Sequence, residues 1–385
     1  MTSKNSSTKK QKKRQKKFKL KYFLVYFLIF TILFTVTFIV SYSYVLKNES
    51  IADEELEVSV DAATGIEITI PRGSSTSDIA NLLNEKGIIE WPSIFKLQSK
   101  INGYDGTFMS GKHIVSKELS YDQLMRVLSS NPVSINVTIR EDYYLGQLLN
   151  SLSDKKLIDK EAFTKSMNTE KFDYKFIEQI PDRENKLEGY LFPDTYFFDP
   201  LSTDREIITK FLDNFDTKFK LDYYARAKEL NMTVDQIITL ASIIEKEATL
   251  PEEKPIISSV FHNRLKSKEP SLKKLQTDAT IQYILYKKEG KIKDNLTEND
   301  TKIDDPYNTY VYEGLPPGPI CNPGLASIEA ALYPEEGSSY YYFVARGDGS
   351  HQFSKTLSEH EAATKKYINN KEEEEEEEEE VEVEE

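Results

Sequence analysis

The chain has 385 residues, which is enough for two or more domains with a sizeable core. Its net charge is −14, and the middle stays acidic once a basic N-terminal segment and a Glu-rich C-terminal tail are set aside, so no nucleic-acid partner is expected. Cys321 is the only cysteine and the four histidines form no H-E-x-x-H motif, so we expect no disulfide framework, no metal site and no cofactor.

Residues 22–46 are predicted to form a transmembrane helix. They contain no charged residue and would extend about 37 Å as a helix, enough to cross a hydrocarbon core of ~30 Å. The alternative is a cleaved signal peptide, which requires a shorter apolar region and a small-residue cleavage site that this segment does not offer. Residues 1–21 carry ten Lys or Arg and no acid, so they should stay in the cytoplasm and the chain after residue 46 should lie outside it.

An internal repeat follows the acidic linker. Ile66–Ile70 and Ile135–Ile139 both alternate apolar and polar residues, which is typical of half-buried strands. Each is followed by a helical pattern of leucines and isoleucines and then by an apolar pair. Two such units indicate small α+β modules rather than a solenoid. They serve either as a spacer from the membrane or in recognition of a polymer.

The segment Lys186–Phe198 is dense in aromatic residues and includes Glu188 and Asp194. Aromatic faces beside a few carboxylates suit a sugar ring, which offers both C–H faces and hydroxyl groups. The alternative is a loop that docks on the core.

The segment Thr233–Thr249 is predicted to form the helix around which the rest is organised. Thr233 and Gln236 have capping-box spacing, and apolar residues recur at helical intervals. At about 100° per residue, Glu245 falls on the apolar side and Glu247 on nearly the opposite side. A carboxyl group held against apolar groups keeps its proton more tightly, so Glu245 is the candidate general acid. The alternative is that Glu245 emerges at a frayed helix end and is solvated.

The C-terminal third is expected to combine short helices, rigid loops and a strand. The Pro- and Gly-rich loops either form cleft walls or are tight connections. Asp278 is the next candidate carboxylate. The predicted elements are helices at Val260–Leu265 and Ile328–Leu332, loops at Asp305–Tyr310 and Gly314–Gly324, a strand at Tyr340–Ala345 and a turn at Gly347–Gly349.

Seven short motifs follow one another between residues 187 and 345. They are LEGYLFPDTY (187–196), LASIIEKEA (240–248), VFHNRL (260–265), LQTDAT (275–280), PYNTY (306–310), GLPPGPICNPGLASIEAAL (314–332) and YYFVA (341–345). In this order and spacing they resemble the endolytic murein transglycosylases, the MltG or YceG-like family. The resemblance covers residues 64 to 368 and includes the N-terminal anchor. The chain departs from the family pattern at Arg140–Asp142, His262 and Ala279.

The resemblance implies a membrane-anchored lytic transglycosylase, a lyase that cleaves the MurNAc-β-1,4-GlcNAc bond inside nascent peptidoglycan strands. It would leave 1,6-anhydroMurNAc ends and help to terminate glycan polymerisation. Glu245 is implied as the single catalytic carboxylate, without a cofactor, and cell-wall synthesis proteins such as penicillin-binding proteins are implied as partners. The substrate-binding residues carried over from the motifs are Glu188, Asn263, Arg264, Gln276, Asp278, Tyr307, Asn308 and Asn322.

One carboxylate is sufficient for this chemistry because the attacking group is the 6-hydroxyl of the same sugar ring, already tethered near the reacting carbon. A hydrolase needs a second carboxyl group, for which Asp278, Glu188 and Asp194 are the candidates. A non-catalytic glycan-binding scaffold of the wall-synthesis machinery is the other alternative.

The expected fold class is α+β, with a single N-terminal transmembrane helix, a LysM-like small α+β region implied by the resemblance, and a mixed α/β catalytic domain. We expect the Glu-rich tail to be solvated and disordered. The predicted boundaries are a basic cytoplasmic tail (1–21), a transmembrane helix (22–46), a linker (47–63), a LysM-like region of two related units (64–168), a catalytic domain (169–370) and a Glu-rich tail (371–385).

Overall fold

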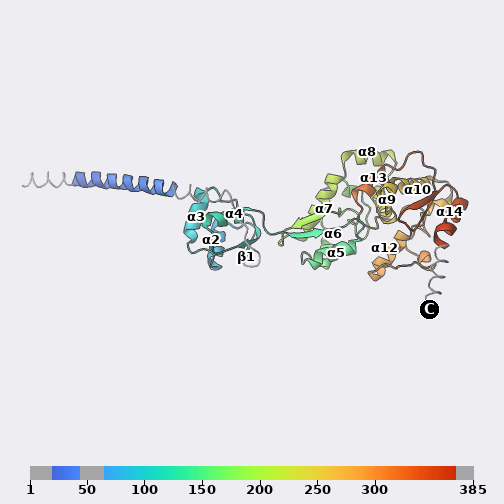
Figure 1. Cartoon of the computed structure of the whole chain (residues 1–385), viewed down its shortest axis with the longest axis horizontal. Helices are drawn as coiled ribbons and strands as arrows, with labels where there is room; N and C mark the ends of the chain where they lie inside the picture. Colours follow the sequence, from blue (N-terminus) through green and yellow to red (C-terminus); the bar gives the residue numbers. More distant parts are fainter. Residues whose placement is uncertain (1–19, 44–64, 370–385) are drawn as a thin grey trace, which may run out of the picture. The chain divides into compact units, whose positions relative to one another are not determined.

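The computed structural model describes residues 20–43 and 65–369 (Figure 1). The predicted basic tail, linker and Glu-rich tail lie largely or wholly outside the described residues. Within the described ranges the fold is α+β, with short helices and three two-stranded antiparallel sheets. The contacts divide the chain into two compact units, Met1–Asn131 and Pro132–Glu385, called unit 1 and unit 2 below.

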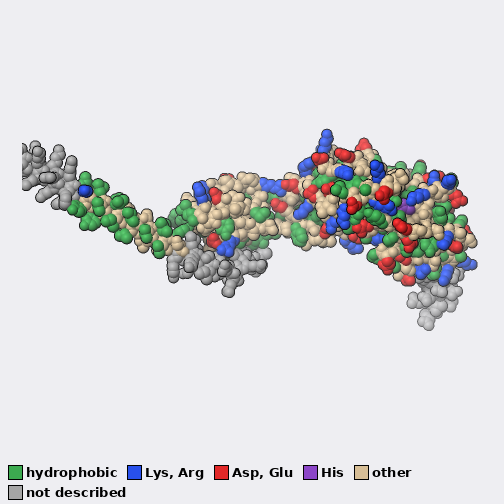
Figure 2. Space-filling model, turned by 90° about the horizontal axis from the view of Figure 1, so that it is seen from above, with side chains coloured by type: hydrophobic (Ala, Val, Ile, Leu, Met, Phe, Trp, Pro, Cys, Tyr) green, Lys and Arg blue, Asp and Glu red, His purple; other side chains and the backbone are tan. Residues whose placement is uncertain are grey.

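The helix Leu20–Ser43 is long and apolar enough to cross a membrane, with a mean hydropathy of 2.7 over its most apolar window. Its apolar side chains cover the visible face of the helix in Figure 2 and make no buried core in the structure. It coincides with the predicted transmembrane segment as far as the described residues extend.

Unit 1 contains one strand–helix–helix–strand module. Strands β1 and β2 pair antiparallel, with Ile66 opposite Val115. Helix α2 begins with a capping box in which Ser75 and Asp78 satisfy each other's backbone N–H groups, as the Ser-x-x-Asp spacing favours. Leu83 and Phe95 are fully buried between the helices and the sheet. The elements of unit 1 after the apolar helix are β1 (Ile66–Ile70), α2 (Thr76–Glu85), α3 (Pro92–Ile101), β2 (Gly111–Val115) and α4 (Tyr121–Ser129).

Unit 2 holds most of the helices and the larger core. Three single turns of 3₁₀ helix, Ile177–Gln179, Pro251–Glu253 and Asp300–Lys302, lie between its longer elements, and a π-helical turn, Lys365–Asn369, follows the last helix. The other elements are β3 (Ile135–Thr138), α5 (Leu145–Asp154), α6 (Lys160–Thr169), β4 (Thr195–Phe198), α7 (Asp204–Lys218), α8 (Leu221–Glu229), α9 (Val234–Glu247), α10 (Lys254–Lys266), α11 (Pro270–Lys273), α12 (Asp278–Glu289), α13 (Leu325–Leu332), β5 (Tyr342–Ala345), β6 (His351–Ser354) and α14 (Leu357–Thr364).

The predicted strand–helix repeat is confirmed in both units, and the second copy extends further than predicted. In unit 2 the order is again strand, helix, helix, strand, because β3 pairs antiparallel with β4, with Ile135 opposite Phe198. Leu148 and Leu152 of α5 are buried in the core that also holds α7 and α9. The second copy therefore belongs to the larger unit, and the observed division at Asn131/Pro132 differs from the predicted boundary at residue 168.

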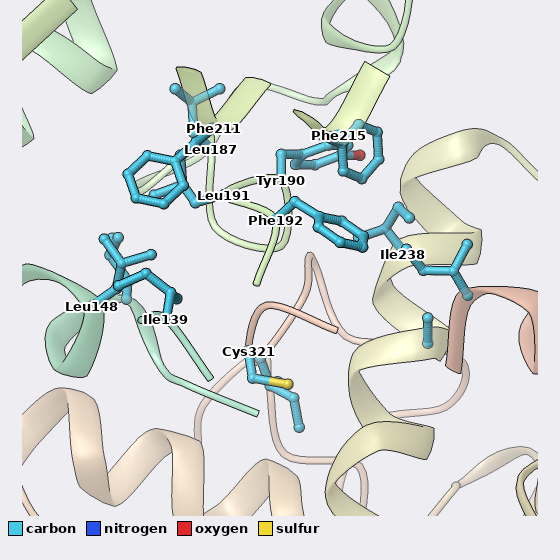
Figure 3. Packing of buried hydrophobic residues seen from close by; sticks show 14 of the residues in the cluster. Ile139, Leu148, Leu187, Tyr190, Leu191, Phe192, Phe211, Phe215, Ile238 and Cys321 are labelled. Atoms are coloured by element: carbon cyan, nitrogen blue, oxygen red, sulfur yellow. The ribbon is translucent and has the colours of Figure 1, made fainter. Parts of the chain in front are cut away.

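The aromatic segment Lys186–Phe198 docks on the core of unit 2 (Figure 3). The Tyr190 ring lies 5.0 Å from the Phe215 ring, and its hydroxyl donates a 2.8 Å hydrogen bond to Asp235. Arg183 completes this network with two hydrogen bonds to the same carboxylate, at 2.7 and 2.8 Å. These contacts favour the docking alternative over an exposed sugar-binding loop.

The two units are expected to unfold as separate transitions, which a matched pair of core truncations tests. Leu83 in unit 1 and Leu148 in unit 2 are both fully buried. Leu83→Ala should destabilise only the unit 1 transition and Leu148→Ala only the unit 2 transition, each by about 2–5 kcal/mol. Calorimetry of the two variants measures both transitions. A shift of one common transition in both variants would contradict the division.

Candidate active site

Helix α9 is deeply buried in unit 2, and two of its three acidic residues lie in its last turn. The predicted capping box is confirmed, since Thr233 accepts from the Gln236 N–H and Gln236 accepts from the Thr233 N–H. Every residue from Ile237 to Ile244 is buried, and α13, α10 and α12 pack against the helix (Figure 1). The carboxyl groups of the E-K-E triplet therefore emerge where α9 leaves the core.

Glu245 is buried as predicted, but it is not an isolated carboxyl group. Its side chain is 7% exposed, and Oε1 lies 2.9 Å from Lys254 Nζ, which is also 7% exposed. Its second oxygen, Oε2, accepts a 2.9 Å hydrogen bond from the backbone N–H of Gly324. The helical pattern predicted apolar neighbours for this carboxyl group; in the structure Lys254 also supplies an opposite charge, and both oxygens have donors.

Glu247 has the environment that was expected for Glu245. Burial and repulsion by the Asp278 carboxylate raise the pKa of Glu247 to about 7, while a backbone hydrogen bond from Ala279 opposes the rise. Its Oε1 is shielded from solvent and has no hydrogen-bond partner among the described residues. The side of α9 that appeared polar in sequence is covered by the start of α12.

Asp278 and Tyr310 lie near Glu247. The Tyr310 hydroxyl donates a 2.5 Å hydrogen bond to Asp278 Oδ1, and burial together with this contact raises the pKa of Tyr310. Gln276 has a left-handed backbone, with φ of 51°, and its side-chain oxygen accepts a 2.8 Å hydrogen bond from Arg264. Of the predicted substrate-binding residues, Asp278 is therefore an exposed group near a carboxyl group with a raised pKa, and Gln276 is exposed two residues before it.

Arg264 joins neighbouring segments through hydrogen bonds. It is buried and donates to the backbone oxygens of Leu272 and Lys274, at 3.0 and 2.7 Å. Its guanidinium group lies over the Tyr342 ring, 5.7 Å from the centroid. Its donors serve the protein backbone and Gln276, so we assign it to the support of the LQTDAT motif rather than to the substrate.

Four of the other predicted residues use their polar atoms in hydrogen bonds within the protein. Asn308 and Asn322 are fully buried, and each joins loops through hydrogen bonds at both ends of its amide. Asn263 donates to the backbone oxygens of Ser338 and Tyr340. Glu188 is buried and accepts from the Leu145 N–H and the Tyr283 hydroxyl, and burial raises its pKa.

Tyr307, the remaining predicted residue, is half-buried with its ring 4.9 Å from that of Tyr283. It packs against the core rather than beside Glu247. Asn308, its neighbour in the PYNTY motif, fixes the loop that carries Tyr310 by accepting from the Tyr310 N–H.

A groove of about 710 Å³ lies on the Glu245 side of α9. Asp194, one of the predicted alternative bases, and Glu141 line it together with Glu245. Burial and repulsion by Glu245 raise the pKa of Glu141, while Lys254 lowers it. A Cβ atom at residue 324 would lie 2.0 Å from a Glu141 carboxyl oxygen, so a substitution there would displace the Glu141 side chain.

The sequence analysis did not predict the contact of Lys254 with Glu245, the contact of Tyr310 with Asp278 or the burial of Glu247. A signal existed for Lys254, which follows Glu245 by nine residues across a Pro-containing turn that reverses the chain. Tyr310 is the last residue of the PYNTY motif, of which only Tyr307 and Asn308 were predicted to bind the substrate.

Comparison with known proteins gives a consistent set of relatives. The sequence model of the YceG-like family matches residues 68–366. A protein of Bacillus subtilis (strain 168) named endolytic murein transglycosylase is 36% identical over 326 residues, which are 82% of this chain and 88% of the relative. Proteins of the same name from two strains of Streptococcus pneumoniae are 29% identical over 358 residues, and the chain spans 62% of their length.

A solved structure is also similar. The crystal structure of a YceG-like protein from Listeria monocytogenes is 35% identical in sequence, with a TM-score of 0.50. The match covers 77% of this chain and 98% of the Listeria chain.

Proposed function

Because the chain belongs to the YceG-like family, we propose that it cleaves glycan strands internally and that Glu247 is its acid and base. The chain is a lytic transglycosylase, a lyase that acts on the glycan strands of peptidoglycan. The observation that carries the residue assignment is the carboxyl group of Glu247, with a pKa of about 7, beside Asp278 and Tyr310.

A pKa near 7 suits a residue that must both give and take a proton. At neutral pH the protonated and ionised forms of such a group are present in similar amounts, which is where general acid–base catalysis is most efficient. Glu247 donates its proton to the glycosidic oxygen as the bond from that oxygen to C1 of N-acetylmuramic acid breaks. The oxygen of the 6-hydroxyl of the same sugar bonds to C1, and the hydroxyl proton passes to the Glu247 carboxylate.

Intramolecular attack explains why a single acid–base residue is sufficient. Tethered groups of this kind reach effective molarities of about 10⁵–10⁸ M, so the protein does not have to activate a separate water molecule. The 1,6-anhydro ring on the product is the direct consequence. Asp278 is held by Tyr310 beside Glu247, where its negative charge sustains the raised pKa and stabilises positive charge that develops on the sugar.

Glu245 takes a structural role in this proposal. Its ion pair with Lys254 and its hydrogen bond from Gly324 join the end of α9 to the start of α10 and to the loop before α13. The family resemblance implies Glu245 as the acid and base instead, and the groove that Glu245 lines with Glu141 and Asp194 supports that second assignment.

Product analysis tests the reaction type. Mass spectrometry of muropeptides released by the full-length protein should show 1,6-anhydromuramyl ends. The proximity of a second carboxylate, Asp278, favours a hydrolase as the second candidate function. A hydrolase leaves reducing ends instead, and predominantly reducing ends would overturn the transglycosylase mechanism.

The remaining parts position the catalytic unit at the membrane. We propose that the helix Leu20–Ser43 is a single-pass anchor with the N-terminus in the cytoplasm and the catalytic unit outside, which its length and hydropathy support. The two strand–helix–helix–strand modules are proposed to be LysM-like, on the basis of that order and the antiparallel pairing of their outer strands. Partners among cell-wall synthesis proteins, such as penicillin-binding proteins, remain part of this proposal.

A further inference from the structure

A second cavity in unit 2 lies outside the cluster around Glu247. It has a volume of about 400 Å³ and is bounded by the first turns of α5, by residues 184–188 and by the second half of α12. Small-molecule pockets typically measure about 300–1,000 Å³, so one or two sugar rings fit in this space. Nothing in the acid–base chemistry of Glu247 uses this cavity.

Aromatic rings form one wall of the cavity. Tyr286 of α12 stacks on Tyr144 with ring centroids 4.5 Å apart. The opposite contact of Tyr144 is with Lys246, whose Nζ lies 4.0 Å from the ring centroid. Tyr144 is buried and Tyr286 only half-buried, so the stack fixes Tyr286 in place while part of its side chain lines the cavity. The C–H face of a pyranose ring packs well on such a surface.

Polar groups lie close to this aromatic wall. Glu188 is 3% exposed, and its carboxyl group accepts from the Leu145 N–H at 3.0 Å and from the Tyr283 hydroxyl at 2.6 Å. Tyr283 also hydrogen-bonds to Tyr307, so these buried groups hold the wall of the cavity in place. Asn150 and Asn185 add amide groups at the rim. Hydroxyl and N-acetyl groups of a sugar need this combination of donors and acceptors.

Helix α12 connects the cavity with the catalytic cluster. Ala279, whose backbone contacts Glu247, is followed at helical spacing by Tyr283 and Tyr286 on the same face. The distance along the helix axis from Ala279 to Tyr286 is about 10 Å. Lys246, which stands between the two glutamates of α9, contacts Tyr144 from the other side. The cavity is thus fixed rigidly to the elements that hold Glu247.

We propose that this cavity is a saccharide subsite that holds an N-acetylated sugar of the glycan strand away from the bond that is cleaved. The proposal rests on the proposed function, since the ligand is taken to be the same polymer. A strand that occupies both places is bound over a longer stretch than the reacting disaccharide. The subsite therefore gives the enzyme a preference for long strands over short ones.

The test compares Tyr286→Ala with the wild type on glycans of two lengths, using the full-length protein in detergent. With long peptide-free glycan strands, KM should rise on the order of tenfold while kcat is unchanged. With short oligosaccharides that cannot reach from the cleaved bond to the cavity, wild type and variant should have the same KM. Tyr333→Ala removes a 46% exposed tyrosine at the end of α13 and should change neither value.

A second variant separates occupation of the cavity from loss of packing. A Cβ atom at residue 146 would lie 2.7 Å from the Tyr286 hydroxyl oxygen, so Gly146→Ala pushes the ring out of place without removing it. It should reproduce the effect on KM for long strands only. Equal KM for long strands in wild type and both variants, or equal losses with long and short glycans, would overturn the subsite. The catalytic assignment is tested separately: it fails if Glu247→Gln retains activity, whatever the result for the subsite variants.

Discussion

Replacing Glu247 by Gln is expected to lower kcat by about 10²- to 10⁴-fold, the range that a positioned general acid–base group contributes. The amide keeps the shape of the side chain but cannot donate a proton to the glycosidic oxygen or accept one from the 6-hydroxyl. KM should change little, because the loss falls on the transition state rather than on binding. The measurement is the rate of release of anhydromuropeptides by the full-length protein.

Glu245→Gln is the matched comparison, two residues earlier on the same helix. It leaves Lys254 without its partner and should lower stability, but the folded fraction should retain most of its kcat. The ratio of the two effects on kcat, corrected for the folded fraction, decides between the two glutamates. A larger loss in Glu245→Gln than in Glu247→Gln would return the acid–base role to Glu245.

The raised pKa of Glu247 adds a readout that does not depend on activity. An ordinary glutamate has a pKa of about 4.3 in an unfolded chain, and that of Glu247 in the folded protein is about 7. Protonated Glu247 therefore stabilises the folded state most below about pH 4.3, and this stabilisation is lost as the pH rises to about 7. Glu247→Gln should consequently be more stable than the wild type at pH 8.

Asp278→Asn removes the charge that repels the Glu247 carboxylate and so lowers the pKa of Glu247. The pH–rate profile of this variant should therefore shift to lower pH.

The local elements were predictable because their signals are local. The Thr233 capping box, the alternation in Ile66–Ile70 and the repeat at Ile135 each depend on a few neighbouring residues, and the structure has all three. The boundary of the second module was missed because its closing strand β4 returns only after residue 194, far from the helices it completes.

The site was only partly predictable. A helical pattern shows which side of α9 faces the core, but it does not show which side chains of other elements lie against each residue. The pattern placed Glu245 towards the core correctly, but it contained no information on Lys254, which arrives from the next helix. On the other face, the start of α12 removes water from Glu247, and no spacing within α9 reveals that contact. Polar motif residues such as Asn322 are equally compatible with a ligand or with a buried backbone, and only tertiary packing decides.

Lys254→Met is expected to lower the free energy of unfolding of unit 2 by about 3–5 kcal/mol, the cost of leaving one partner of a buried ion pair uncompensated. The methionine fills a similar volume, so little of the effect comes from a cavity. The remaining Glu245 carboxylate would keep one hydrogen bond, from Gly324, and lose its ion pair with Lys254. Urea unfolding of the wild type and the variant measures the difference.

The double variant Glu245→Gln with Lys254→Met identifies charge as the cause. It removes both buried charges, while the side-chain oxygen of the introduced glutamine can still accept from Gly324, so most of the lost stability should return. Because Glu247 is unchanged, the activity of the double variant should be close to that of the wild type. If the double variant is no more stable than Lys254→Met, the lysine acts through packing of its aliphatic chain, and the ion pair is not what joins α9 to α10.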